Sequence, residues 1–90
     1  MIDGTEQHFG VNPSIVATDL EDELVLLDPA SQQIFSLNAT GRAIWQSLPA
    51  SRASLTRTLE QRFEVEPSQA DADVKGLLRS LVDAGLVREL

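Results

Sequence analysis

The 90-residue sequence contains no cysteine, no tyrosine and only one histidine. Without cysteine the chain can form no disulfide, thiolate nucleophile or cysteine metal ligand. Basic residues are also few, since seven lysines and arginines stand against fourteen acidic residues and give a formal net charge of −7. Nucleic-acid binding depends on basic side chains that neutralise phosphates, so this charge balance argues against a nucleic-acid partner.

Long apolar runs are missing as well. No segment approaches the roughly 18 consecutive apolar residues of a membrane span. The N-terminal residues lack the basic region and apolar core of a signal peptide. We therefore expect a cytoplasmic protein without a membrane partner. Ninety residues are enough for one small domain with a thin core, which leaves little room for an active-site cavity.

Groups that could carry chemistry are equally scarce. His8 has no partner residue at useful spacing, and Asp71 and Asp73 have no histidine or cysteine to complete a site. The acidic turn at residues 19–23 lacks the glycine and the spacing of a calcium loop. There is no glycine-rich phosphate loop and no nucleophile elbow. The sequence thus predicts no catalytic residue, no metal site and no cofactor.

What the chain does have is a clear change of pattern near residue 38. Three strand-length runs come first, at residues 14–19, 24–27 and 32–37. Three helical segments follow, at residues 39–48, at about 51–64 and at about 68–84. Strands followed by helices predict an α+β fold, in which a three-stranded antiparallel meander is covered by three helices. Residues 1–13 are expected to be a loose segment before a domain at residues 14–90, whose end, residues 86–90, could return as a short strand.

Local signals mark the ends of the helices. Asn38 is a good N-cap for the first helix, and Gly41 in its first turn would let that helix lie close to the sheet. Ser68–Asp71 approximates a capping box at the start of the third helix. Gly85 suits the position just after the end of that helix, with Leu86 following as its apolar contact.

A three-stranded sheet has two edges, and an exposed edge can pair with another strand. If residues 32–37 form an edge, their free backbone groups could bind an extended peptide by strand addition. The third helix could supply a wall, because Asp73, Gly76 and Ser80 repeat at helical spacing around a floor made by Leu77.

Two features of the third helix have more than one interpretation. Gly76 would permit the close approach of another backbone, could instead pack against a neighbouring helix, or could have no role. Lys75 and Arg79 could meet acidic residues of a peptide, although pairing with Asp71 and Asp83 at i±4 spacing is favoured.

The ordered segments of the chain resemble the PqqD family. The resemblance is carried by LVLLD, IFSLNATGRAIW, SLTRTLEQRFEV and ADVKGLLRSLVDAGLV, and it covers about residues 14–88. It implies a winged helix-turn-helix-like α+β fold with three N-terminal strands and three helices. The positions that look structural in this pattern are Asn38, Gly41, Trp45, Gly85 and Leu86.

The resemblance also implies a non-catalytic recognition element for the leader of a ribosomally made, modified peptide. Such domains bind the precursor's leader as an added strand and present it to a separate maturation enzyme, such as a leader peptidase or a radical SAM enzyme. Lasso-peptide, pyrroloquinoline quinone and related pathways all remain open. Carried onto this chain, the peptide-binding residues are Gln33, Ile34, Phe35, Ser36, Asp73, Val74, Leu77 and Ser80.

Two other functions remain as alternatives. The fold would permit a winged-helix DNA-binding regulator, but its reading helix would carry three aspartates against two basic residues. A scaffold subunit that pairs with itself through the same sheet edge is the other alternative.

Overall fold

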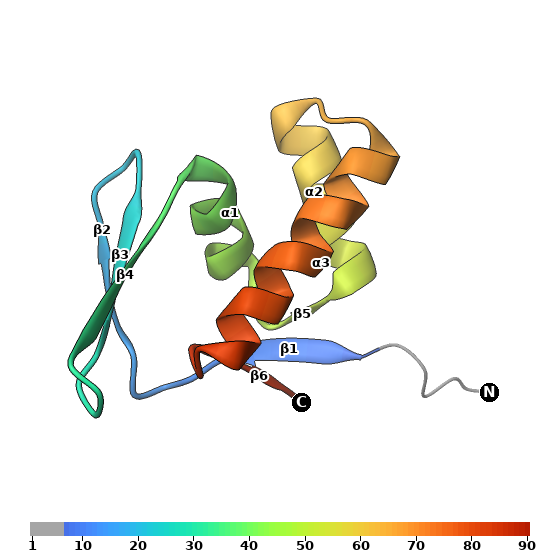
Figure 1. Ribbon diagram of the computed structural model, residues 1–90. Coiled ribbons are helices and arrows are strands. Elements are labelled where there is room, and N and C mark those ends of the chain that lie inside the picture. The colour runs from blue at the N-terminus through green and yellow to red at the C-terminus, as the bar shows by residue number, and fades with distance from the viewer. Residues whose placement is uncertain (1–6) are drawn as a thin grey trace.

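The predicted meander is present in the computed structural model, which describes residues 7–90 (Figure 1). The elements in chain order are β1 (His8–Val11), β2 (Val16–Asp19), β3 (Leu24–Asp28), β4 (Gln33–Leu37), α1 (Ala39–Ser47), β5 (Ala50–Ser51), α2 (Arg52–Phe63), α3 (Pro67–Asp83) and β6 (Val87–Glu89). Strands β2, β3 and β4 form an antiparallel sheet with β3 in the centre. The α+β prediction, a three-stranded antiparallel sheet followed by three helices, is confirmed.

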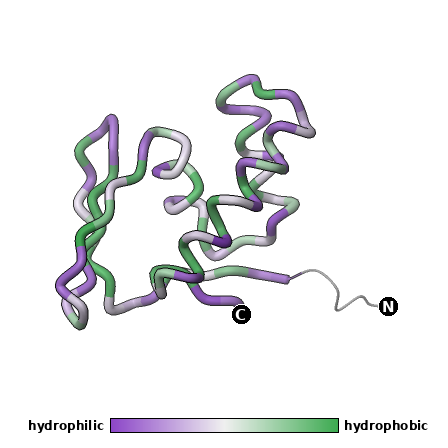
Figure 2. The backbone as a smooth tube through the Cα atoms, in the orientation of Figure 1, coloured by the Kyte–Doolittle hydropathy of each residue, from purple (hydrophilic) through white to green (hydrophobic). Residues whose placement is uncertain are grey.

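Polar turns separate the strands of this sheet from one another. In Figure 2 the two turns are largely hydrophilic, whereas the strands between them carry the hydrophobic residues. The Asp28 side chain closes the second turn by accepting bonds from the Ala30 N–H (3.0 Å) and the Ser31 hydroxyl (3.1 Å). Gln32 completes the turn in the left-handed region, with φ of 63°. This local chemistry explains why β3 and β4 pair as immediate neighbours.

Helix α1 begins directly after β4 and packs on the sheet. Asn38 is its N-cap, as predicted, and the side-chain oxygen accepts a bond from the Gly41 N–H at 2.9 Å. A Cβ atom at position 41 would lie 3.0 Å from the Cβ of Leu37, so Gly41 does allow close approach of the helix to the end of β4. The order of these residues therefore fixes where the β4 edge lies relative to α1.

The C-terminal end of α3 agrees with the prediction, and its N-terminal end does not. Gly85 has φ of +79°, and the N–H groups of Gly85 and Leu86 bond to the carbonyls of Val82 and Leu81, which is the expected glycine-terminated helix end. The predicted capping box at Ser68 is wrong, because the helix begins at Pro67 with Glu66 as a cap that makes no side-chain bond. Proline needs no N–H partner in the first turn, so it takes the start of the helix.

A second sheet, with strand order β5–β1–β6, was not expected. Residues 1–6 of the segment predicted to be loose lie outside the described residues, but His8–Val11 forms β1 and pairs with both β5 and β6. The reason is burial: Phe9 is only 8% exposed and belongs to the core. The short return strand predicted at residues 86–90 is confirmed as β6.

One hydrophobic core joins the two sheets and the three helices. Its completely buried large side chains are Leu26, Ile44, Leu55, Leu59, Val74 and Leu86. Each stabilises the fold by about 1.5–3 kcal/mol relative to an exposed position. Figure 1 shows α1 between the β2–β4 sheet on one side and the α2–α3 pair on the other.

Candidate functional site

Strand β4 is an edge strand. It pairs with β3 on one side, and within residues 7–90 no other strand pairs with its second side. The free edge expected at residues 32–37 is therefore present in the folded chain. A free strand edge is a row of unpaired backbone donors and acceptors that another extended chain can join.

The strand register tells which residues of β4 present these free groups. In an antiparallel ladder, the N–H and C=O of successive residues point alternately to opposite sides of the strand. The Leu20 N–H bonds to the Glu23 carbonyl, which directs Val25 and Leu27 toward β2 and leaves Leu24, Leu26 and Asp28 to bond with β4. The bond from the Gln32 N–H to the Asp28 carbonyl, 2.7 Å long, agrees with this assignment.

It follows that Phe35 and Leu37 bond to β3 through their backbones, because they are paired with Leu26 and Leu24. The N–H and C=O groups of Ile34 and Ser36 face the open edge instead. The β4 part of the site therefore consists of the backbone groups of Ile34 and Ser36. Phe35, which lies between them, uses its backbone groups to bond to β3.

The side chains of β4 alternate between the two faces of the sheet. Phe35 is half-buried and Leu37 buried, and both pack against the core. Ile34 is 69% exposed, and Ser36 is exposed with its hydroxyl donating to the Glu23 carboxylate at 2.6 Å. Gln33, at the start of the strand, is exposed.

The part of α3 predicted to line the site has both exposed and buried residues. We call the exposed residues Asp73, Gly76 and Ser80 the open strip. Asp73, Gly76 and Ser80 are exposed, while Leu77 is half-buried and packs on the core. Nothing lies within 4 Å of a Cβ atom placed on Gly76, so this glycine does not pack against a neighbouring helix. Val74 is 0% exposed, so its side chain supports the core and is not available to a peptide in this structure.

Strand β4 and helix α3 are brought together through α1 rather than by direct packing on one another. Helix α1 contacts β3, β4 and α2, and α2 packs extensively on α3. Phe35 from β4 and Leu77 from α3 both pack against the same core cluster. The strand part and the helix part of the predicted site therefore each contact the hydrophobic core of the domain.

The basic residues of α3 point elsewhere. At about 100° per residue, Lys75, Leu78 and Val82 lie on the side of the helix roughly opposite Asp73, Leu77 and Ser80. The favoured i±4 pairing of Lys75 with Asp71 and of Arg79 with Asp83 is wrong, because neither pair forms an ion pair in the described chain. Asp71 is instead 3.5 Å from the Nε atom of Arg52 on α2.

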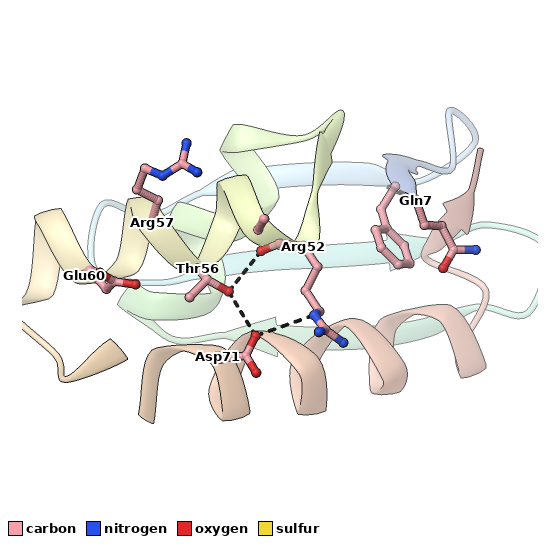
Figure 3. Close-up of a pocket in the computed structure, with 8 residues that line it drawn as sticks. Gln7, Arg52, Thr56, Arg57, Glu60 and Asp71 are labelled. Atoms are coloured by element: carbon pink, nitrogen blue, oxygen red, sulfur yellow. Dashed lines mark hydrogen bonds and ion pairs between the residues drawn. The ribbon is translucent and has the colours of Figure 1, made fainter. Parts of the chain in front are cut away.

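Two adjoining cavities lie on this opposite side of α3. The larger, of about 550 Å³, is lined by one face of α2 together with Phe9 and Asp71. Figure 3 shows Arg52, Thr56 and Asp71 pointing toward one another in it, with the Thr56 hydroxyl donating to the Arg52 carbonyl at 2.9 Å. The second cavity, of about 300 Å³, shares Phe9 and Arg52 with the first and is lined further by Lys75 and Arg79.

We call the two cavities together the groove. The sequence did not predict the groove, because its lining residues come mainly from β1, α2, α3 and β6. The one available signal was the concentration of basic residues after position 51. Four of the chain's seven basic residues line the two cavities: Arg52, Arg57, Lys75 and Arg79.

One ion pair holds the end of the sheet against α1. The Arg42 guanidinium donates to both carboxylate oxygens of Asp19, at 2.7 and 2.8 Å. These bonds, together with one from the Glu21 N–H at 2.8 Å, lower the pKa of Asp19 to about 2. The same contact raises the pKa of Arg42. Asp19 and Arg42 therefore tie β2 to α1 across the sheet.

Among residues 7–90, no three histidine, cysteine, aspartate or glutamate side chains are grouped as metal ligands would be. In the same part of the chain, none of the helices is long and apolar enough to span a bilayer.

The fold and the edge define a small α+β domain of the winged helix-turn-helix-like class with an open strand beside its first helix. The family model described as coenzyme PQQ synthesis protein D (PqqD) matches residues 23–87. The chain belongs to the PqqD family.

Two solved structures share this fold. A lasso peptide synthetase B1 complexed with the leader peptide is 32% identical, with a TM-score of 0.79 over 89% of this chain and 96% of the other. TbiB1 in complex with the TbiA(beta) leader peptide is 23% identical, with a TM-score of 0.81 over 88% of this chain and 94% of the other. A comparison with curated protein sequences gave no significant match.

Proposed function

We propose that the chain is a non-catalytic module that captures the leader of a ribosomally made precursor peptide as an additional strand on β4. The observation that carries this proposal is the open edge at Ile34 and Ser36, in a chain of the PqqD family. The similarity to two proteins whose structures contain a leader peptide supports it.

The proposed contact residues divide by role. The backbones of Ile34 and Ser36 supply the ladder bonds, and Gln33 and Phe35 flank them on the other face of the strand. Asp73, Leu77 and Ser80 line the helical side of the bound leader. Val74 contributes only indirectly, because its side chain is buried in the core cluster against which Leu77 packs.

Capture of this kind needs no catalytic group. Holding the leader converts the meeting of precursor and enzyme into an almost intramolecular event, which raises the effective concentration of the substrate. Ordering a flexible leader costs free energy, so affinity has to come from the ladder bonds together with a few apolar anchors. A free strand edge and half-buried Phe35 and Leu77 provide both.

The partner that receives the captured precursor is a separate maturation enzyme in the cytoplasm. The 32% identity to a lasso peptide synthetase B1 favours a lasso-peptide pathway with a leader peptidase over a radical SAM partner. The cavities beside α2 and α3 include no residue of β4, and they offer this enzyme a surface with apolar residues and charges of both signs. No observation favours DNA binding, since α3 exposes Asp73 and Asp83.

A proline substitution at the edge tests strand addition directly. Ile34→Pro removes an N–H that faces the open edge, so we expect a loss of leader affinity of at least about tenfold while the sheet stays folded. Phe35→Pro would instead remove a bond to Leu26 and is expected to unfold the sheet. Titration of the precursor, followed through the only tryptophan, Trp45, or by calorimetry, measures the effect.

The matched control is Ala17→Pro. Ala17 lies on β2, the other edge of the same sheet, and its backbone also faces outward, because Val16 and Thr18 make the bonds to β3. Leader affinity should be unchanged in this variant. Equal affinities for Ile34→Pro and the wild-type protein, with both folded, would rule out strand addition at β4.

A further inference from the structure

The outer face of the β2–β4 sheet carries an aliphatic row that ends at the open edge. The register places Val16 opposite Leu27 and Leu27 opposite Ile34, so the three side chains stand side by side across the sheet. They are 51%, 36% and 69% exposed. We call Val16, Leu27 and Ile34 the outer row.

Exposure is greatest at the end of the row where a fourth strand would be added. A strand that pairs with β4 places one residue directly opposite Ile34, with its side chain on the same face and a Cβ–Cβ separation of about 4.5–5.5 Å. That side chain would cover Ile34 and continue the outer row. The proposed leader site therefore has a subsite on the outer face of the sheet, opposite the face on which Phe35 packs against the core.

We infer that this subsite selects an aliphatic side chain in the bound peptide, at the residue that pairs with Ile34. The inference rests on the strand addition proposed above and names the class of peptide that the strand accepts. Apolar and β-branched cross-strand pairs stabilise a sheet, and the residue that already pairs with Ile34 on β3, Leu27, is aliphatic.

The neighbouring outward position has a different chemistry. Ser36 stands in a second cross-strand row with Val25 and Thr18, and its hydroxyl is bonded to the Glu23 carboxylate at 2.6 Å. A small or hydrogen-bonding side chain fits opposite this position better than a large apolar one. The peptide pattern is therefore an aliphatic residue and a small polar residue separated by one residue, which faces the inner side.

A displayed library of random short peptides tests this pattern whatever the sequence of the precursor. Selection on the wild-type protein should enrich peptides with the aliphatic–x–small polar spacing. Selection on Ile34→Lys should replace the aliphatic residue with aspartate or glutamate at that one position and leave the inner-facing preferences unchanged. Lysine is well tolerated on exposed edge strands, so this variant should fold.

Val16→Lys is the matched control, because Val16 ends the same row at the far edge of the sheet, with β3 and β4 between it and the added peptide. It should select the same peptides as the wild-type protein. In direct titration, an acidic peptide selected on Ile34→Lys should bind that variant about 5- to 10-fold more tightly than it binds the wild type.

The outcomes separate the two proposals. If wild type and Ile34→Lys select the same residues at every position, and Ile34→Pro loses the selected peptides, strand addition stands and the outer subsite is overturned. If the selected peptides bind Ile34→Pro as tightly as the wild-type protein, both the strand addition and the subsite are overturned.

Discussion

At the scale of single residues, the Asp19–Arg42 pair is the clearest electrostatic feature of the fold. It joins the last residue of β2 to α1, and Gln46 one turn further along the helix also donates to Asp19 at 3.2 Å. The pair links the end of β2 to α1 at the surface, beside the packing of α1 on β3 and β4. Because both side chains are accessible to solvent, we expect its effect to weaken as salt concentration rises.

The lowered pKa of Asp19 predicts a specific dependence of stability on pH. The carboxyl group has a pKa of about 2 in the folded chain against an ordinary value of 3.8. Its contribution to the free energy of unfolding is therefore complete above about pH 5 and is lost as pH falls toward 2. Urea denaturation at a series of pH values should show that the difference between wild type and Asp19→Asn grows from pH 2 to pH 5 and is constant above. A difference that does not change with pH would contradict this role for Asp19.

At the scale of elements, α3 has two faces with different tasks. One face exposes Asp73, Gly76 and Ser80 toward the side that we assign to the leader, and the other lines the groove with Lys75 and Arg79. A glycine in the interior of a helix is unfavourable unless something requires it. No packing contact within residues 7–90 accounts for a glycine at position 76, which leaves the approach of a bound backbone and the absence of any role as the two explanations.

Replacing this glycine should improve the helix and impair the site. Gly76→Ala is expected to raise the free energy of unfolding by about 0.5–1 kcal/mol, because alanine favours the helix and space is available. Leader affinity should fall about 3- to 10-fold if the added strand approaches α3 here. Thermal unfolding and titration together check both parts. A more stable variant with unchanged affinity would show that the open strip of α3 lies outside the binding surface.

The elements also show which parts of the structure were predictable from the sequence. β3, β4 and α1 follow each other with short polar turns and a strong cap at Asn38, so local chemistry defines them. β1 and β5 are short and pair with partners far along the chain, and nothing local marks them as strands. Helical spacing placed Val74 and Leu77 together on the apolar face of α3, but only the packing of the folded chain decides that Val74 is fully buried and Leu77 half-buried.

At the scale of the whole molecule, the chain separates two surfaces. The β4 edge is open, and on α3 Asp73 and Ser80 lie roughly opposite the side of the helix that lines the cavities sharing Phe9 and Arg52. The cavities carry charges of both signs, because they are lined by the basic residues Arg52, Arg57, Lys75 and Arg79 and by the acidic residues Glu60, Asp71, Asp83 and Glu89. The proposed leader site and these cavities therefore use different parts of the fold.

The central claim, that a guest strand joins β4, is tested most directly by amide hydrogen exchange of the protein with and without bound leader. The Ile34 and Ser36 amides face the open edge, so they should exchange fast in the free protein and slowly in the complex. The Phe35 amide, bonded to β3, should be protected in both states, and the Ala17 amide on the opposite edge should not change. Unchanged fast exchange at both Ile34 and Ser36 in a saturated complex would contradict the account.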